Sequence, residues 1–152
     1  MTSPPIEKDI VVKRIEGIEA EVRELESLAK QSRDVFTSGD GHKLAHYHLH
    51  RALEGVFNIG SHILSRIPGG QTTQYKEIAL KLGEFGIVPK KFAETMLVEM
   101  AKYRNRLVHF YAQVSPDELY EIVRDDLADF ETFLSAVKQL LLHPEQYRVS
   151  VD

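Results

Sequence analysis

Apolar residues recur three and four positions apart along almost the whole chain, and this spacing limits the possible folds more than any other feature. No stretch alternates apolar and polar residues with the period of two that a half-buried strand shows. The sequence therefore predicts an all-α protein, an up-and-down bundle of four long helices plus one short helix. The first long helix carries its repeat on Val11, Ile15, Ile18, Val22, Leu25 and Ala29.

Glycine and proline clusters separate the predicted helices. The expected helical segments are 6–36, 42–67, 73–82, 89–113 and 116–142. The last segment begins with a capping Ser115, a proline in the first turn and Glu118 placed to bond back to the cap. Because the loops are short, we expect one domain over 1–152, with flexible tails at 1–5 and 144–152.

The composition excludes several classes of function. The 152 residues include no cysteine, which rules out disulfide scaffolds, zinc ribbons and thiol catalysis. No apolar run approaches the roughly 20 residues that cross a bilayer, and the first residues lack secretory character, so a cytoplasmic location is expected. A net charge of −4 argues against a general nucleic-acid coat but allows a local basic patch. The segment 89–113 carries such an excess of basic residues.

Arg104 and Tyr111 fall in the middle of the apolar face of the predicted helix 89–113. An arginine cannot be buried there unpaired, so either an acid on a neighbouring helix pairs with Arg104 or the helix faces a polar cleft. Asn105 and His109 lie four residues apart on the opposite side, where Asn105 can bond the imidazole and fix its tautomer. Taken alone, these residues also suit a structural salt bridge, a surface histidine and a core tyrosine. The apolar face itself comprises Ala93, Met96, Leu97, Met100, Leu107 and Val108.

The segment 42–67 carries two further patterns. His42, His46, His50 and Glu54 recur every four residues, but their positions drift around the helix and no second ligand motif completes a site, so no metal is expected. A stripe of polar residues along the same segment has two interpretations. It is either a solvated face of the helix, or a dimer contact or cleft wall that faces 89–113, where Glu54 would partner Arg104. Gly55 within it allows a close approach by a backbone or a substrate. The stripe consists of Tyr47, Arg51, Glu54, Asn58 and His62.

Residues 104–111, RNRLVHFY, resemble the signature of the HepT-like proteins in the HEPN superfamily: Arg, four residues, His, any residue, Tyr. Two stretches of the preceding long helix, 51–54 (RALE) and 58–62 (NIGSH), look like the corresponding helix of that family. The length and the five-segment layout also agree. The resemblance therefore covers nearly the whole chain and implies an HEPN-like helical bundle.

The resemblance implies a homodimeric, metal-independent endoribonuclease that needs no cofactor, the toxin of a toxin–antitoxin pair. Its antitoxin would be a small nucleotidyltransferase of the MntA type. Matched residue by residue, Arg104 and His109 occupy the catalytic positions, Asn105 a supporting position, and Tyr111 that of a tyrosine modified with AMP. These residue types suit RNA, whose 2′-hydroxyl is the nucleophile: a histidine moves the proton and an arginine binds the phosphate. Lys102 and Arg106 would add further contacts to the substrate.

The spacing of the two catalytic positions poses a geometric problem. On an ideal helix Arg104 and His109 point roughly 140° apart, so one straight helix does not aim both at one phosphate. A local helix distortion, the reach of arginine or a cleft between two protomers would solve this, and we favour the symmetric dimer. The alternatives to a nuclease are a catalytically silent module that docks a nucleotidyltransferase and helps to bind nucleotide or substrate, and a plain oligomeric scaffold.

Overall fold

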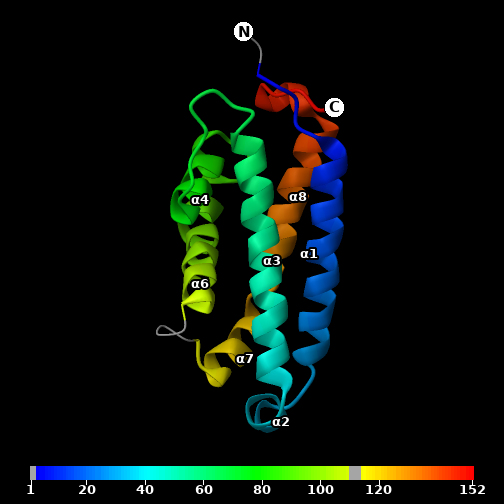
Figure 1. Ribbon diagram of the computed structural model, residues 1–152, viewed down its shortest axis with the longest axis vertical. Coiled ribbons are helices and arrows are strands. Elements are labelled where there is room, and N and C mark those ends of the chain that lie inside the picture. The colour runs from blue at the N-terminus through cyan, green and yellow to red at the C-terminus, as the bar shows by residue number, and fades with distance from the viewer. Residues whose placement is uncertain (1–2, 110–113) are drawn as a thin grey trace.

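The computed structural model describes residues 3–109 and 114–152, and the only β-structure in this part of the chain is one isolated bridge. Figure 1 shows α1, α3 and α8 running side by side along the long axis, with α4 and α6 on the opposite side of α3 from α1. The predicted all-α bundle is confirmed. The elements are α1 (Lys8–Leu28), α2 (Arg33–Ser38), α3 (Gly41–Leu64), α4 (Tyr75–Glu84), α5 (Lys90–Phe92), the π-helix η1 (Ala93–Leu97), α6 (Val98–Val108), α7 (Pro116–Asp125), α8 (Ala128–Leu142) and the 3-10 helix η3 (Pro144–Tyr147).

The core forms around α3, which packs against α1, α2, α4, α6 and α7. At Gly55 the two long helices α1 and α3 approach so closely that an added Cβ would lie 2.6 Å from Cγ1 of Ile18. The close approach expected at Gly55 is therefore made by α1. No helix in the described part of the chain is long and apolar enough to cross a membrane. The side chains of α3 that are almost fully buried include Leu49, Leu53, Val56, Phe57, Ile59 and Ile63.

Two of the predicted long helices are each divided in two. The segment expected to be one helix from 6 to 36 ends at Leu28 in α1, and α2 starts again after Ser32, whose Oγ accepts a hydrogen bond from the Val35 N–H at 3.3 Å. The last segment is interrupted between α7 and α8. Apolar spacing continues across both breaks, so the periodicity did not reveal them.

The predicted helix 89–113 differs from an ideal helix in two ways. The π-helical turn η1 takes more residues per turn than an α-helix and so shifts the helical register. Met96 (47% exposed) and Val108 (39% exposed) leave the predicted apolar face, whereas Val98 and Ala101 are buried. The described helix then ends at Val108. A helical wheel that gives every residue from 89 onward the α-helical rotation therefore misplaces residues near both ends of the predicted helix.

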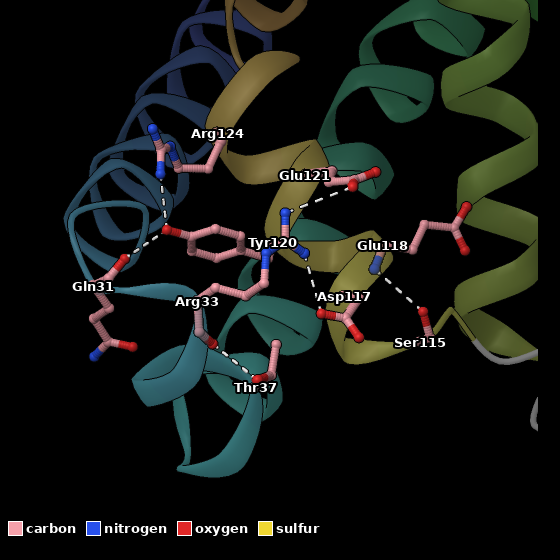
Figure 2. A network of polar contacts seen from close by, with 9 residues as sticks. All are labelled: Gln31, Arg33, Thr37, Ser115, Asp117, Glu118, Tyr120, Glu121 and Arg124. Carbon is pink, nitrogen blue, oxygen red and sulfur yellow. Dashed lines mark hydrogen bonds and ion pairs between the residues drawn. The ribbon is translucent and has the colours of Figure 1, made fainter.

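The junction between α2 and α7 closes one end of the bundle (Figure 2). The Tyr120 hydroxyl donates to the Gln31 backbone carbonyl and accepts from Arg124, both at 2.8 Å. Arg33 lies over the Tyr120 ring, with 4.9 Å between guanidinium carbon and ring centroid, and pairs with Asp117 at 3.1 Å. These contacts hold α7 against α2.

The predicted cap of α7 forms, but only its first half. Ser115 Oγ accepts from the Glu118 N–H at 3.2 Å (Figure 2). The expectation that the Glu118 side chain bonds back to the cap is wrong, because that carboxylate binds Arg106 at 2.7 Å. A guanidinium that offers two parallel N–H groups is a stronger partner for a carboxylate than one backbone amide.

The two ends of the chain lie together at the other end of the bundle (Figure 1). Ile6 forms a parallel bridge with Val151, with Ile6 N–H donating to the Ser150 carbonyl at 2.8 Å. The Glu7 N–H donates to His62 Nε2 at 3.1 Å. Residues 144–152 therefore differ from the flexible tail expected there, because η3 and this bridge pack them against the start of α1.

Candidate functional site

Arg104 is held by side chains from α3 and α4 and by its own neighbour in sequence. Its Nε donates to Glu54 Oε1 at 2.5 Å, and its Nη1 donates to Asn105 Oδ1 at 3.2 Å. The guanidinium carbon lies 4.0 Å from the centroid of the Tyr75 ring. The Arg104 side chain is 24% exposed and that of Glu54 27%, so the pair lies at the edge of the core rather than sealed within it. Of the two possibilities that the sequence left open for Arg104, an acid on a neighbouring helix pairs with it, and this acid is Glu54, the residue suggested for that role.

Tyr75 ties the same carboxylate to α4. Its hydroxyl donates to Glu54 Oε2 at 3.1 Å, so Arg104 and Tyr75 occupy different oxygens of Glu54. Burial, and then the Glu54 carboxylate, raise the pKa of Tyr75, which keeps the hydroxyl a donor at neutral pH. His50 adds a nitrogen 3.7 Å from Glu54 Oε1. Sequence reasoning missed Tyr75, because nothing near it in the chain marks a functional residue.

The Arg104 guanidinium keeps hydrogen-bonding capacity. It carries five N–H donors, and the contacts to Glu54 and Asn105 use only part of them. Its charge is compensated by one carboxylate, and its plane is fixed against an aromatic ring. A guanidinium held in this way is preorganised to bind an anion that presents two oxygens, such as a phosphate.

His109 lies just past the end of α6, where the backbone leaves the helical conformation with φ −102° and ψ 109°. The ideal-helix angle between Arg104 and His109 therefore does not apply, because α6 ends one residue before His109. His109 is exposed. Asn105 Oδ1 accepts a hydrogen bond from Arg104 Nη1. Tyr111 lies outside the described residues.

His46 of α3 is half-buried. Burial, followed by the nearby His50, lowers the pKa of His46, so the ring is neutral at pH 7. Among the described residues, no group of three or more His, Asp or Glu is arranged to hold a metal ion.

Lys102 and Arg106 are not brought to the Arg104 cluster. Arg106 is engaged by both oxygens of Glu118 on α7, each at 2.7 Å. The hydrogen bonds from Arg106 hold the pKa of Glu118 below its ordinary value. Lys102 pairs with Glu99 at 3.1 Å. Because these basic side chains pair with acids of this chain, much of the positive charge that the sequence shows in 89–113 is neutralised within the protein.

The polar stripe of α3 divides between three places. Glu54 belongs to the Arg104 cluster, and His62 accepts from the Glu7 backbone. Arg51 pairs with Glu21 of α1 at 2.8 Å and lies 5.3 Å from the Tyr47 ring centroid. Burial raises the pKa of Glu21, but hydrogen bonds from Arg51 and His48 lower it by more. Arg51, Glu54 and Asn58 line a groove whose other wall is α1, so the stripe does not face only α6 as expected.

Comparisons with known proteins agree with this architecture. Residues 18–137 match the family model described as Ribonuclease HepT-like. A protein of Aphanizomenon flos-aquae described as tRNA nuclease HepT is 24% identical over 142 residues, 93% of this chain and 96% of the relative.

Solved structures share the fold. One is a tri-AMPylated Shewanella oneidensis HEPN toxin in complex with MNT antitoxin, with TM-score 0.78 and 21% identity over 86% of this chain and 98% of that one. A toxin–antitoxin structure with AMP-PNP gives TM-score 0.77 and 20% identity over the same shares.

Proposed function

Since the chain belongs to the Ribonuclease HepT-like family, we propose that it is a cytoplasmic endoribonuclease toxin, neutralised by a nucleotidyltransferase antitoxin. The observation that carries this proposal is the mounting of Arg104, which Glu54 and Tyr75 hold at the surface, one turn before His109. An arginine and a histidine of this kind suffice for phosphodiester cleavage in RNA, because the substrate supplies its own nucleophile.

The proposed reaction is a transfer within the RNA backbone. The 2′-oxygen attacks the neighbouring phosphorus, its proton passes to the His109 imidazole, and the bond to the 5′-oxygen breaks. The products are a 2′,3′-cyclic phosphate and a 5′-hydroxyl, whose oxygen takes the proton that the His109 imidazolium carries. Arg104 binds the non-bridging oxygens, where negative charge grows in the transition state.

Digestion of RNA by the purified protein with metals chelated tests this function. Arg104→Ala and His109→Ala should each lower the cleavage rate about a hundredfold or more while the helical circular dichroism stays unchanged. Lys91→Ala removes an exposed charge from α5 and should cleave normally. Undiminished cleavage by either active-site variant contradicts the assignment. A protein that cuts no RNA yet binds the transferase stably would instead be the non-catalytic docking module.

The proposed homodimer places contributions from two chains at each site. Mixing Arg104→Ala with His109→Ala protein tests this directly. If each site takes its arginine from one chain and its histidine from the other, mixed dimers regain one intact site and the mixture recovers about a quarter of full activity. If one chain supplies both groups, the mixture stays inactive.

The proposed neutralisation is transfer of AMP to Tyr111. The adduct would add bulk and negative charge near the arginine and so repel RNA. Its support is the family motif together with the tri-AMPylated state of the similar HEPN toxin. After incubation with the cognate transferase and ATP, mass spectrometry should place AMP on Tyr111, and Tyr111→Phe should stay unmodified. Modification confined to other residues would exclude this role.

A further inference from the structure

A groove of about 490 Å³ runs between α1 and α3 and meets the Arg104 cluster at Glu54. In Figure 1 these two helices lie side by side over most of their length. Its lining includes Lys13, Arg14 and Gly17 from α1, and Arg51, Glu54 and Asn58 from α3. The proposed chemistry does not use this groove, although it shares a side chain with the site.

The charges within the groove leave an excess of positive charge. Glu21 is compensated by Arg51 at 2.8 Å and is hydrogen-bonded to His48 at 2.6 Å. Glu54 is compensated by Arg104. Lys13 and Arg14 are both exposed, and neither forms an ion pair with any residue that the structure describes. An anion entering the groove therefore meets two uncompensated cations and no uncompensated acid among the groups named above.

The register of the two antiparallel helices places these cations relative to Arg104. Gly55 packs on Ile18, and Arg51 pairs with Glu21, so Lys13 and Arg14 lie at the opposite end of the groove, near Asn58. Eight residues of α1, from 13 to 21, span about 12 Å. Glu54 lies near the middle of that length. An added Cβ at Gly17 would meet nothing within 4 Å, so the α1 wall is low at this point.

Beyond Arg51 the surface offers an aromatic platform. Tyr47 is 54% exposed, and the Arg51 guanidinium lies 5.3 Å from its ring centroid. Exposed aromatic rings beside a basic groove are the features on which single-stranded nucleic acids bind, with bases stacked on rings and phosphates near cations. The centre of a protein interface is depleted of charged residues, whereas the middle of this groove holds the Glu54 carboxylate beside Gly55 and Ile18.

We propose that this groove binds the single-stranded RNA that flanks the cleaved bond. Lys13 and Arg14 bind backbone phosphates on one side of Arg104, and Tyr47 stacks a base on the other. The inference rests on the proposed ribonuclease function and adds a subsite to it.

Binding of an RNA that cannot be cut tests the groove separately from catalysis. The probe is a single-stranded RNA of about 12 nucleotides with 2′-fluoro riboses, followed by fluorescence anisotropy between about 50 and 200 mM salt. The double variant Lys13→Ala/Arg14→Ala should bind about tenfold more weakly, and the salt slope should fall by about 1.4, since each phosphate contact contributes about 0.7. Tyr47→Ala should weaken binding at an unchanged slope, because stacking releases no counterions.

The matched control is Lys90→Ala/Lys91→Ala, which removes the same charge from two adjacent exposed residues of α5. It should keep both affinity and slope. If the groove variant binds like this control, the subsite is wrong even when the wild type cleaves RNA. If the wild type cleaves no RNA, the proposed function fails whatever the binding shows. A groove variant whose mass in solution changes would mark the groove as a contact between copies and overturn the RNA assignment.

Discussion

At the scale of single residues, the central requirement is that the Arg104 guanidinium stays oriented while part of it remains open. Three contacts meet it: Glu54 on one N–H, Asn105 on another and the Tyr75 ring against the plane. Glu54 also receives the Tyr75 hydroxyl, so the carboxylate and the ring hold each other. Tyr75 is therefore a positioning residue for Arg104.

Substitutions of Tyr75 separate its two contacts. Tyr75→Phe keeps the ring beneath Arg104 and loses only the bond to Glu54, so RNA cleavage should fall about two- to tenfold. Tyr75→Leu also removes the cation–π contact and should cost about another tenfold. The loss is expected in kcat, because a misplaced guanidinium fails chiefly in the transition state. Equal kcat in Tyr75→Leu and wild type, with both proteins folded by circular dichroism, would contradict this role.

At the scale of elements, the contact between α1 and α3 sets the geometry of both the core and the groove. Each of the two helices carries a glycine on this side, but only Gly55 of α3 lies at the close approach. An added Cβ at Gly55 would lie 2.6 Å from Ile18, whereas one at Gly17 would meet nothing within 4 Å. The two positions therefore form a natural pair for measuring what the close approach contributes.

Alanine should have opposite effects at these two glycines. Gly17→Ala should raise the free energy of unfolding by up to about 1 kcal/mol, the usual difference between the two residues inside a helix. At Gly55 the same gain is set against a steric cost of about 1–3 kcal/mol, so Gly55→Ala should be neutral or destabilising. Urea unfolding of both variants measures the difference. An equal stabilisation by the two substitutions would show that α1 moves away without cost.

At the scale of the whole molecule, the chain closes by joining its two ends at one end of the bundle. The bridge between Ile6 and Val151 buries Ile6 completely, and His62 accepts the next backbone N–H. Burial, followed by the positive charge of Arg66, lowers the pKa of His62. The neutral ring is thus the form that can accept the hydrogen bond.

The sign of the resulting pH dependence follows from this shift. With the folded pKa below the unfolded value of about 6.5, the unfolded chain binds the proton more readily. The contribution of His62 is thus fully present above about pH 6.5 and is lost as the pH falls through the folded pKa. His62→Gln keeps an acceptor but does not titrate, so its free energy of unfolding should change less between about pH 7.5 and 5. The pKa of His46 is also lowered, so part of the pH dependence should remain in the His62→Gln variant. An unchanged pH profile would contradict the role of His62.

The sequence by itself determined the helical class, the Ser115 cap, the rule that Arg104 cannot be buried unpaired and the positions of the family motif. Each of these depends on residues within a turn or two of one another, where spacing and hydrogen-bonding capacity are readable without a fold. Only the tertiary structure decided that Tyr75 fixes Arg104, that Glu118 leaves its cap for Arg106, and that the α3 stripe shares a groove with α1. Tyr75 and Arg104 lie far apart in the sequence, in α4 and α6. Which side chains meet over such a distance depends on how helices cross and where they break, and local periodicity carries no record of that.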